Sequence, residues 1–128
     1  MPAVSPRDMD HPFDIREDQR SNGVMVIAVR GVIDLFTAPE FKAGLFGVID
    51  RGTDRIVVDF SETLFVDSSA LAALLAARKR LAGRHGQLAI AGLNPRLTDT
   101  FRLTGLDQLF LVETSCERAV DVLAETMP

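Results

Sequence analysis

The residues best suited to chemistry in this 128-residue chain are an acid followed by two hydroxyls, Asp67-Ser68-Ser69. Asp and Ser are favoured where helices begin, because their oxygens accept hydrogen bonds from backbone N–H groups that have no helical partner. A serine there is also a good place for a phosphate, since a helix N-terminus offers free N–H groups and a partial charge of roughly +0.5. The triplet is therefore a helix cap or a modification site, and on the residues alone the cap is the simpler interpretation.

Three more polar residues follow other apolar segments. Asp34 is either a turn residue or a carboxylate that contacts a partner. Thr37 and Glu40 form a capping-box pattern, in which the Thr oxygen accepts the N–H of Glu40. Asn94 precedes Pro95, a pair that predicts the start of another helix.

Catalytic patterns are missing from the sequence. His11 and His85 are far from Ser68 along the chain, and one cysteine, Cys116, gives no zinc spacing. No nucleophile elbow, phosphate-binding loop or dinucleotide fingerprint occurs. We therefore expect no enzyme activity, no metal and no cofactor, and we expect Cys116 to be a buried small residue rather than a reactive thiol.

Composition points to one ordinary globular domain, with 47% hydrophobic and 25% charged residues. No apolar run approaches the about 18 residues of a membrane span, and the N-terminus lacks the apolar core of a signal peptide. The net charge of −4, without a basic cluster on a predicted binding face, argues against nucleic acid. The single cysteine fits a reducing compartment, so we expect a cytoplasmic protein.

The elements that must position these residues alternate between strands and helices. Proline-rich residues 1–12 predict a flexible tail, which leaves 13–128 as one domain. A weak strand near 13–17 turns through Asn22-Gly23 into the next strand. The other strands are predicted at 24–30, 55–60, 87–91 and 109–112. Helices are predicted after Thr37, over 68–82, from Asn94 to Gly105, and after a second capping box at Thr114-Ser115-Cys116-Glu117.

This order predicts an α/β fold with a mixed, mostly parallel five-stranded sheet and about four helices. Functional groups in such sheets gather at the carboxyl ends of strands, here the connections 31–37, 61–68 and 92–95. We expect one polar rim that contacts a partner, made of Asp34, Thr37, Asp67, Ser68, Ser69 and Asn94. The core is expected to hold Phe41, Phe46, Phe60, Phe65, Phe101 and Phe110.

Three segments resemble the STAS domain of bacterial anti-sigma factor antagonists. IVVDFSETLFVDSSALAALLAARKRL (56–81) is similar to the centre of that domain, and RGVIDLFTAPEF (30–41) is similar to its segment after an early strand. GLNPRLTDTFRLTGLDQLFLVETSCERAVDVL (92–123) resembles its last part. Together the resemblance covers about residues 13–126.

The resemblance implies a function. In that family the first hydroxyl after the Asp is phosphorylated, which here is Ser68, with Ser69 as the alternative. The unphosphorylated domain binds an anti-sigma factor that is also a serine kinase, so that a sigma factor is released. Phosphorylation weakens this complex, and a serine phosphatase resets it. Asp34 matches an acid near the binding surface.

One residue departs from the family pattern, since Ala70 stands where a Gly usually follows the second hydroxyl. Two alternatives remain open. One is a STAS subunit of a transport or stress-signalling complex that is never phosphorylated. The other is a sensor that binds a small molecule or nucleotide on the same rim.

Overall fold

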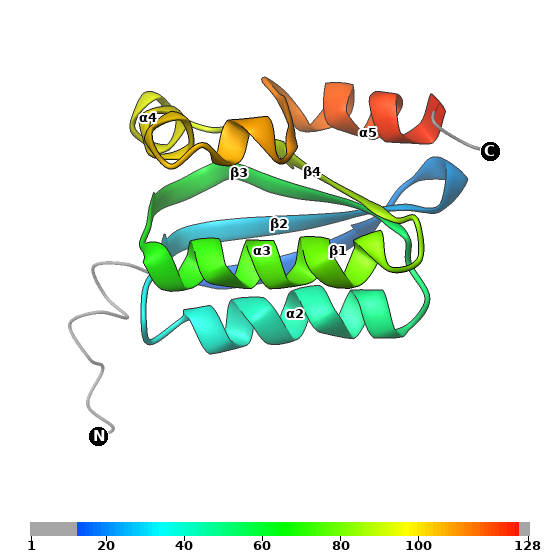
Figure 1. The fold of residues 1–128 in the computed structure, drawn as a ribbon, viewed down its shortest axis with the longest axis horizontal. Helices are drawn as coiled ribbons and strands as arrows, with labels where there is room; N and C mark the ends of the chain where they lie inside the picture. The colour runs from blue at the N-terminus through cyan, green and yellow to red at the C-terminus, as the bar shows by residue number, and fades with distance from the viewer. Residues whose placement is uncertain (1–12, 126–128) are drawn as a thin grey trace.

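The computed structural model describes residues 13–125. Its fold is a five-stranded mixed sheet with helices on both faces (Figure 1). The strand order is β1-β2-β3-β4-β5; β1 pairs antiparallel with β2, and the remaining pairs are parallel. The predicted fold class is thus confirmed. The predicted tail, residues 1–12, lies outside the described residues.

Strands and helices alternate along the described chain. The strands are β1 (Asp14–Gln19), β2 (Val24–Ile33), β3 (Arg55–Val66), β4 (Gln87–Ala91) and β5 (Leu111–Glu113). The helices are α2 (Ala38–Asp50), α3 (Ser68–Ala82), α4 (Pro95–Leu103) and α5 (Cys116–Glu125), with short 3₁₀ turns at Ser21–Gly23 and Leu106–Gln108.

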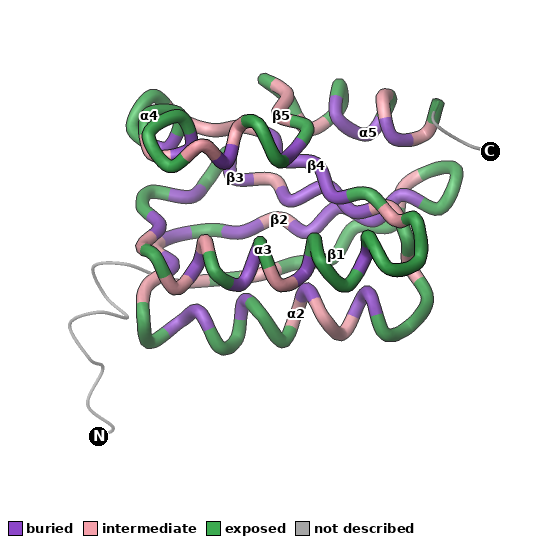
Figure 2. The backbone as a smooth tube through the Cα atoms, in the orientation of Figure 1, coloured by how far each residue is buried: buried purple, intermediate pink, exposed green. Residues whose placement is uncertain are grey.

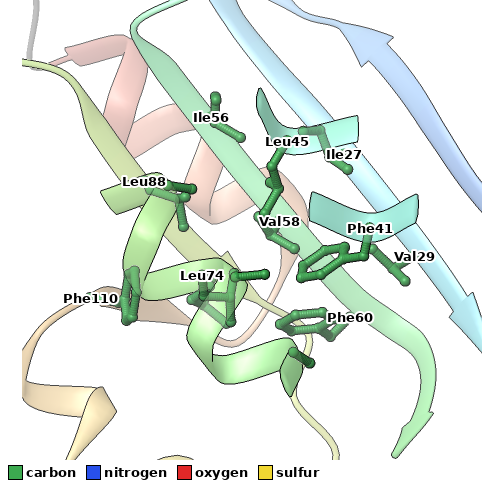
Figure 3. Close-up of a cluster of buried hydrophobic side chains, with 14 of the residues drawn as sticks. Ile27, Val29, Phe41, Leu45, Ile56, Val58, Phe60, Leu74, Leu88 and Phe110 are labelled. Atoms are coloured by element: carbon green, nitrogen blue, oxygen red, sulfur yellow. The ribbon is translucent and has the colours of Figure 1, made fainter. Parts of the chain in front are cut away.

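The larger part of the core lies between the sheet and the pair of helices α2 and α3, which run side by side (Figures 1 and 2). Phe60 of β3 lies in this core beside Phe41 (Figure 3), with its ring centroid 6.2 Å from that of Phe41 and 6.3 Å from that of Phe101. These three rings are at most 1% exposed. They fix α2 and α4 against the strand that leads to Asp67.

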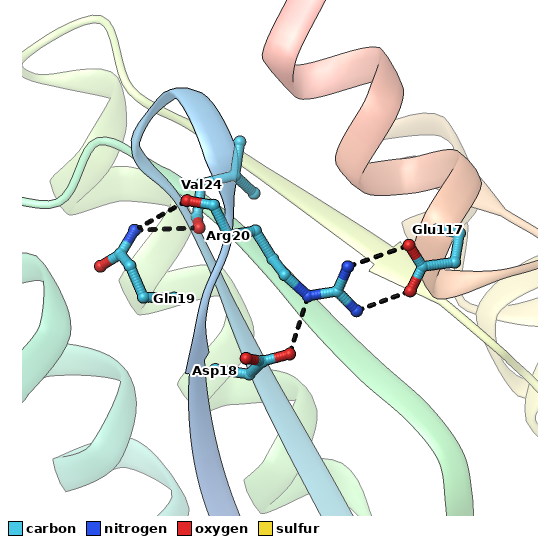
Figure 4. A network of polar contacts seen from close by, with 5 residues as sticks. All are labelled: Asp18, Gln19, Arg20, Val24 and Glu117. Carbon is cyan, nitrogen blue, oxygen red and sulfur yellow. Dashed lines mark hydrogen bonds and ion pairs between the residues drawn. The ribbon is translucent and has the colours of Figure 1, made fainter.

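The other face of the sheet is covered by α5, whose Ala119, Val120 and Leu123 pack on β2, β3 and β4. The Asn22-Gly23 turn forms as predicted, with both residues at positive φ. Just before this turn, Arg20 donates two hydrogen bonds to the carboxylate of Glu117 in α5 and forms an ion pair with it (Figure 4). This contact ties the β1–β2 hairpin to the last helix.

β3 is longer than its apolar run predicts, because it continues through residues 61–66, which were expected to be a connection. The register against β2 shifts twice, so that β3 carries an extra residue near Ser61 and another at Leu64. Such β-bulges interrupt the alternation of side chains between the two faces. The predicted end at Phe60 was therefore wrong, and the true connection from β3 to α3 is Asp67 alone.

Other boundaries differ by a few residues. β2 extends to Ile33, and β5 begins at Leu111 rather than at residue 109. The predicted capping box at Thr114 was wrong by one residue, because Ser115 Oγ accepts the N–H of Arg118 and α5 begins at Cys116.

The phenylalanine prediction was right for Phe41, Phe60, Phe101 and Phe110, all buried. Phe46 is half-buried at the edge of the core. Phe65 is 36% exposed, so its assignment to the core was wrong. The bulge at Leu64 explains this, because it turns Leu64 and Phe65 toward solvent before Val66 returns to the core.

Candidate functional site

The predicted rim residues lie at one end of the sheet, where β2, β3 and β4 finish. Ile33 pairs with Val66, and the N–H of Asp67 donates to the carbonyl of Ile33 at 3.0 Å. The connections that hold Asp34 and Asp67 therefore begin next to each other. Asn94 joins them through its side-chain amide, which donates to the carbonyl of Thr63 at 3.2 Å.

Asp67 is the N-cap of α3. Its Oδ1 accepts the N–H of Ser69 at 2.9 Å and that of Ala70 at 3.3 Å, and it also accepts the hydroxyl of Ser69. The predicted cap is thus present. The Ser69 hydroxyl is engaged within the protein.

Ser68 differs from Ser69 in both exposure and bonding. It is the first residue of α3 and is exposed, whereas Ser69 is half-buried. Within residues 13–125 no hydrogen bond of the Ser68 hydroxyl is found. Of the two hydroxyls, that of Ser68 is the one available to an incoming protein.

The expectation that a phosphate at Ser68 would meet free helix N–H groups needs correction. The Asp67 carboxylate already accepts the N–H groups of Ser69 and Ala70. A phosphate on Ser68 would therefore follow a carboxylate directly in the chain and would find these two N–H groups already bonded. Ala70, the departure from the family pattern, is fully buried and points into the core rather than toward the surface.

Asp34 and Thr37 build a closed turn instead of a capping box. The Oδ1 of Asp34 accepts the N–H groups of Phe36 at 2.9 Å and Thr37 at 3.1 Å. The Thr37 hydroxyl donates to the carbonyl of Val32 and accepts the N–H of Asp34. The expected bond from the Glu40 N–H was wrong, because Thr37 is already helical in backbone and its side chain makes no cap bond.

This turn changes how two predicted rim residues can act. Thr37 is 5% exposed, so it holds the rim in shape without offering a surface of its own. Asp34 is half-buried and uses its carboxylate to fix the turn. Asn94 likewise caps α4, accepting the N–H of Leu97 at 2.8 Å.

Large exposed apolar side chains lie in the segments on either side of the contact between Ile33 and Asp67. Sequence reasoning missed Leu35, Phe36 and Leu64, and it assigned Phe65 to the core. Leu35 and Phe36 project from the Asp34 turn, 70% and 72% exposed. Leu64 is 55% exposed, and the ring of Phe65 lies 5.1 Å below the guanidinium of Arg96. Apolar residues directly after the acid of a tight turn were the available signal for Leu35 and Phe36.

Nothing in the described residues assembles a catalytic centre around Ser68. His85 follows the far end of α3, and a helix of 15 residues is about 22 Å long. His11 lies outside the described residues. Within residues 13–125 no group of three or more His, Cys, Asp or Glu side chains could hold a metal ion.

The thiol of Cys116 is poorly suited to reaction. It is half-buried at the start of α5, on the face of the sheet covered by that helix. Burial, helped by the nearby Asp59 carboxylate, raises its pKa to about 11. Because the thiolate is the reactive form, this position favours the predicted structural role.

No helix between residues 13 and 125 has the length and apolar character needed to cross a bilayer.

Comparison with known proteins places these features in a family. Residues 17–113 match the family model described as "Mlab, STAS domain". The anti-sigma-B factor antagonist of Listeria monocytogenes is 30% identical over 105 residues, which span 82% of this chain and 90% of that protein.

Two solved structures share the fold. An anti-sigma factor antagonist from Mycobacterium paratuberculosis matches with a TM-score of 0.82 and 25% identity, covering 94% of this chain and 98% of that one. The Bacillus cell fate determinant SpoIIAA in its phosphorylated form matches with a TM-score of 0.67 and 22% identity, over 84% and 97% of the two chains. The chain therefore belongs to the STAS domain family, among the bacterial anti-sigma factor antagonists.

Proposed function

We propose that this protein is a cytoplasmic binding module, not an enzyme, that captures a serine-kinase anti-sigma factor and so releases a sigma factor. The kinase then phosphorylates Ser68, the complex weakens, and a serine phosphatase restores the binding form. The observation that carries this proposal is the contrast between two adjacent hydroxyls. That of Ser68 is exposed and available, and that of Ser69 is bonded to Asp67.

The location of Ser68 supports a switch that acts on binding and leaves the fold in place. Its side chain is exposed at the first position of α3, so a phosphate there displaces no core residue. The phosphate adds about −1.5 to −2 charges. The Asp67 carboxylate belongs to the preceding residue and already accepts the N–H groups of Ser69 and Ala70.

The energy needed for such a switch is modest. Disturbing charge complementarity at a buried interface costs about 2–5 kcal/mol, and about 2.7 kcal/mol weakens binding roughly 100-fold. A dianion trapped at the interface beside Asp67, which already holds the N–H groups of Ser69 and Ala70, falls in this range. One phosphate is enough, and no refolding is needed.

The rim residues divide into two roles in this proposal. Ser68 and the exposed apolar side chains of Leu35, Phe36, Leu64 and Phe65 make contact with the partner. Asp34, Thr37, Asp67, Ser69 and Asn94 hold the loops that present this surface, through the hydrogen bonds described above.

The test is affinity capture from the cytosol of the native organism with the wild-type protein, Ser68→Asp and a matched control, Ser21→Asp. Ser21 is an exposed serine in the turn between β1 and β2. The proposal predicts that wild type and Ser21→Asp retain a kinase-fold anti-sigma factor, identified by mass spectrometry, and that Ser68→Asp loses it. If all three proteins retained the same partner equally, the switch would be refuted. If that partner were a transporter or a scaffold protein, the alternative function would hold, in which this protein is a STAS subunit that is never phosphorylated.

A further inference from the structure

An apolar groove lies between the first halves of α2 and α3, with Ser69, the neighbour of Ser68, in its wall and a volume of about 330 Å³. Its walls combine apolar residues from the two helices and from the Asp34 turn with one lysine and one serine. They are Leu35, Ala38, Pro39, Lys42, Ser69, Ala72 and Ala73.

The groove exists because α3 begins with small side chains. Ala72 is exposed and Ala73 is buried, so neither fills the space between the helices. At the mouth of the groove Leu35 is 70% exposed, although it is a large apolar residue. The hydrogen bonds of Asp34 and Thr37 hold the Leu35 backbone in place, so the groove is formed before any partner arrives.

We infer that this groove receives an apolar segment of the anti-sigma factor, an inference that rests on the proposed function. Ser68 and Ala72 are one helical turn apart, and residues at this spacing are neighbours on one helix face. A segment seated over Ala72 therefore reaches Ser68. The phosphate would then stand where the partner enters the groove, which links docking to the switch.

The charges around the groove fit a partner segment with basic residues beside its apolar ones. Asp34, Asp67 and the exposed Glu40 lie at the N-terminal ends of α2 and α3, whereas Lys42 is the cation among the groove residues. A second copy of this chain fits less well. A two-fold contact would bring the same acidic surface of both copies together, and like charges at an interface are unfavourable.

The test compares Ala72→Gln with the matched control Ala43→Gln. Ala43 is also an exposed alanine within a helix, on α2, and it does not line the groove. Both changes add the same uncharged side chain, so helix propensity and net charge change equally. Leu35→Ser, in the exposed turn, is a third variant that removes apolar surface without touching the core.

The variants are used as capture proteins beside wild type and Ser68→Asp, and the captured anti-sigma factor is then purified and titrated against each. Truncating a central interface residue often weakens binding roughly 10-fold or more, and we expect a side chain that occupies the groove to have a similar effect. We expect this loss for Ala72→Gln and Leu35→Ser, and wild-type affinity for Ala43→Gln, with all proteins equally folded by circular dichroism.

The outcomes separate the two claims. If Ala72→Gln and Leu35→Ser bind as wild type while Ser68→Asp does not, the groove is not the docking site and the proposed function stands. If wild type captures no anti-sigma factor, the proposed function falls and the groove inference falls with it.

Discussion

Replacing Asp67 with alanine tests whether this carboxylate acts as a cap, and the structure sets the expected size of the effect. Its Oδ1 accepts the N–H groups of Ser69 and Ala70 and also the Ser69 hydroxyl. Loss of an N-cap costs about 0.5–2 kcal/mol, and loss of the negative charge at the helix start adds about 0.3–1 kcal/mol. We therefore expect Asp67→Ala to lower the free energy of unfolding by about 1–3 kcal/mol.

The matched control is Asp67→Asn, because Asn caps helices as well as Asp does but carries no charge. It should lose only the charge contribution, so its stability should lie between wild type and Asp67→Ala. Urea unfolding followed by circular dichroism measures both, with unchanged m-values as the sign that the folded state is intact. The cap account would be refuted if Asp67→Ala matched wild type, or if Asp67→Asn were as unstable as Asp67→Ala.

Further predictions concern the core and the thiol. Phe60→Ala removes the ring between Phe41 and Phe101 and should lower the free energy of unfolding by about 3–5 kcal/mol in the same urea experiment; a loss below about 1 kcal/mol would contradict its central position. With its pKa raised from 9.0 to about 11, Cys116 should react with iodoacetamide at pH 8 about 100-fold more slowly in the native protein than in urea, and equal rates would contradict its burial. Since the unfolded thiol ionises first, Cys116 also favours folding below pH 9, and this contribution should be lost as the pH rises toward 11.

The fold could be predicted from the sequence because the patterns that mark strands, helix caps and turns agree with one another. The β-branched runs in β2 and β3 are buried, and the caps at Asp67 and Asn94 form the predicted hydrogen bonds. The Asn22-Gly23 turn takes the positive φ values that this pair favours. Each of these elements depends on residues close together in the chain.

What could not be predicted depends on contacts between distant segments. The bulges of β3 follow from its register against β2, and they decide that Phe65 faces solvent. Thr37 has a capping-box partner in sequence, but its hydroxyl is taken by the end of β2 instead. The groove beside Ala72 arises only when α2 and α3 pack together.

The most direct test of the central claim is the affinity of the captured anti-sigma factor for this protein with and without phosphoserine at position 68. The account predicts binding roughly 100-fold weaker for the phosphorylated form, from the interface penalty of about 2.7 kcal/mol, and an unchanged circular dichroism spectrum. Equal affinity of the two forms would contradict it, and would leave Ser68 as the first residue of a helix and nothing more.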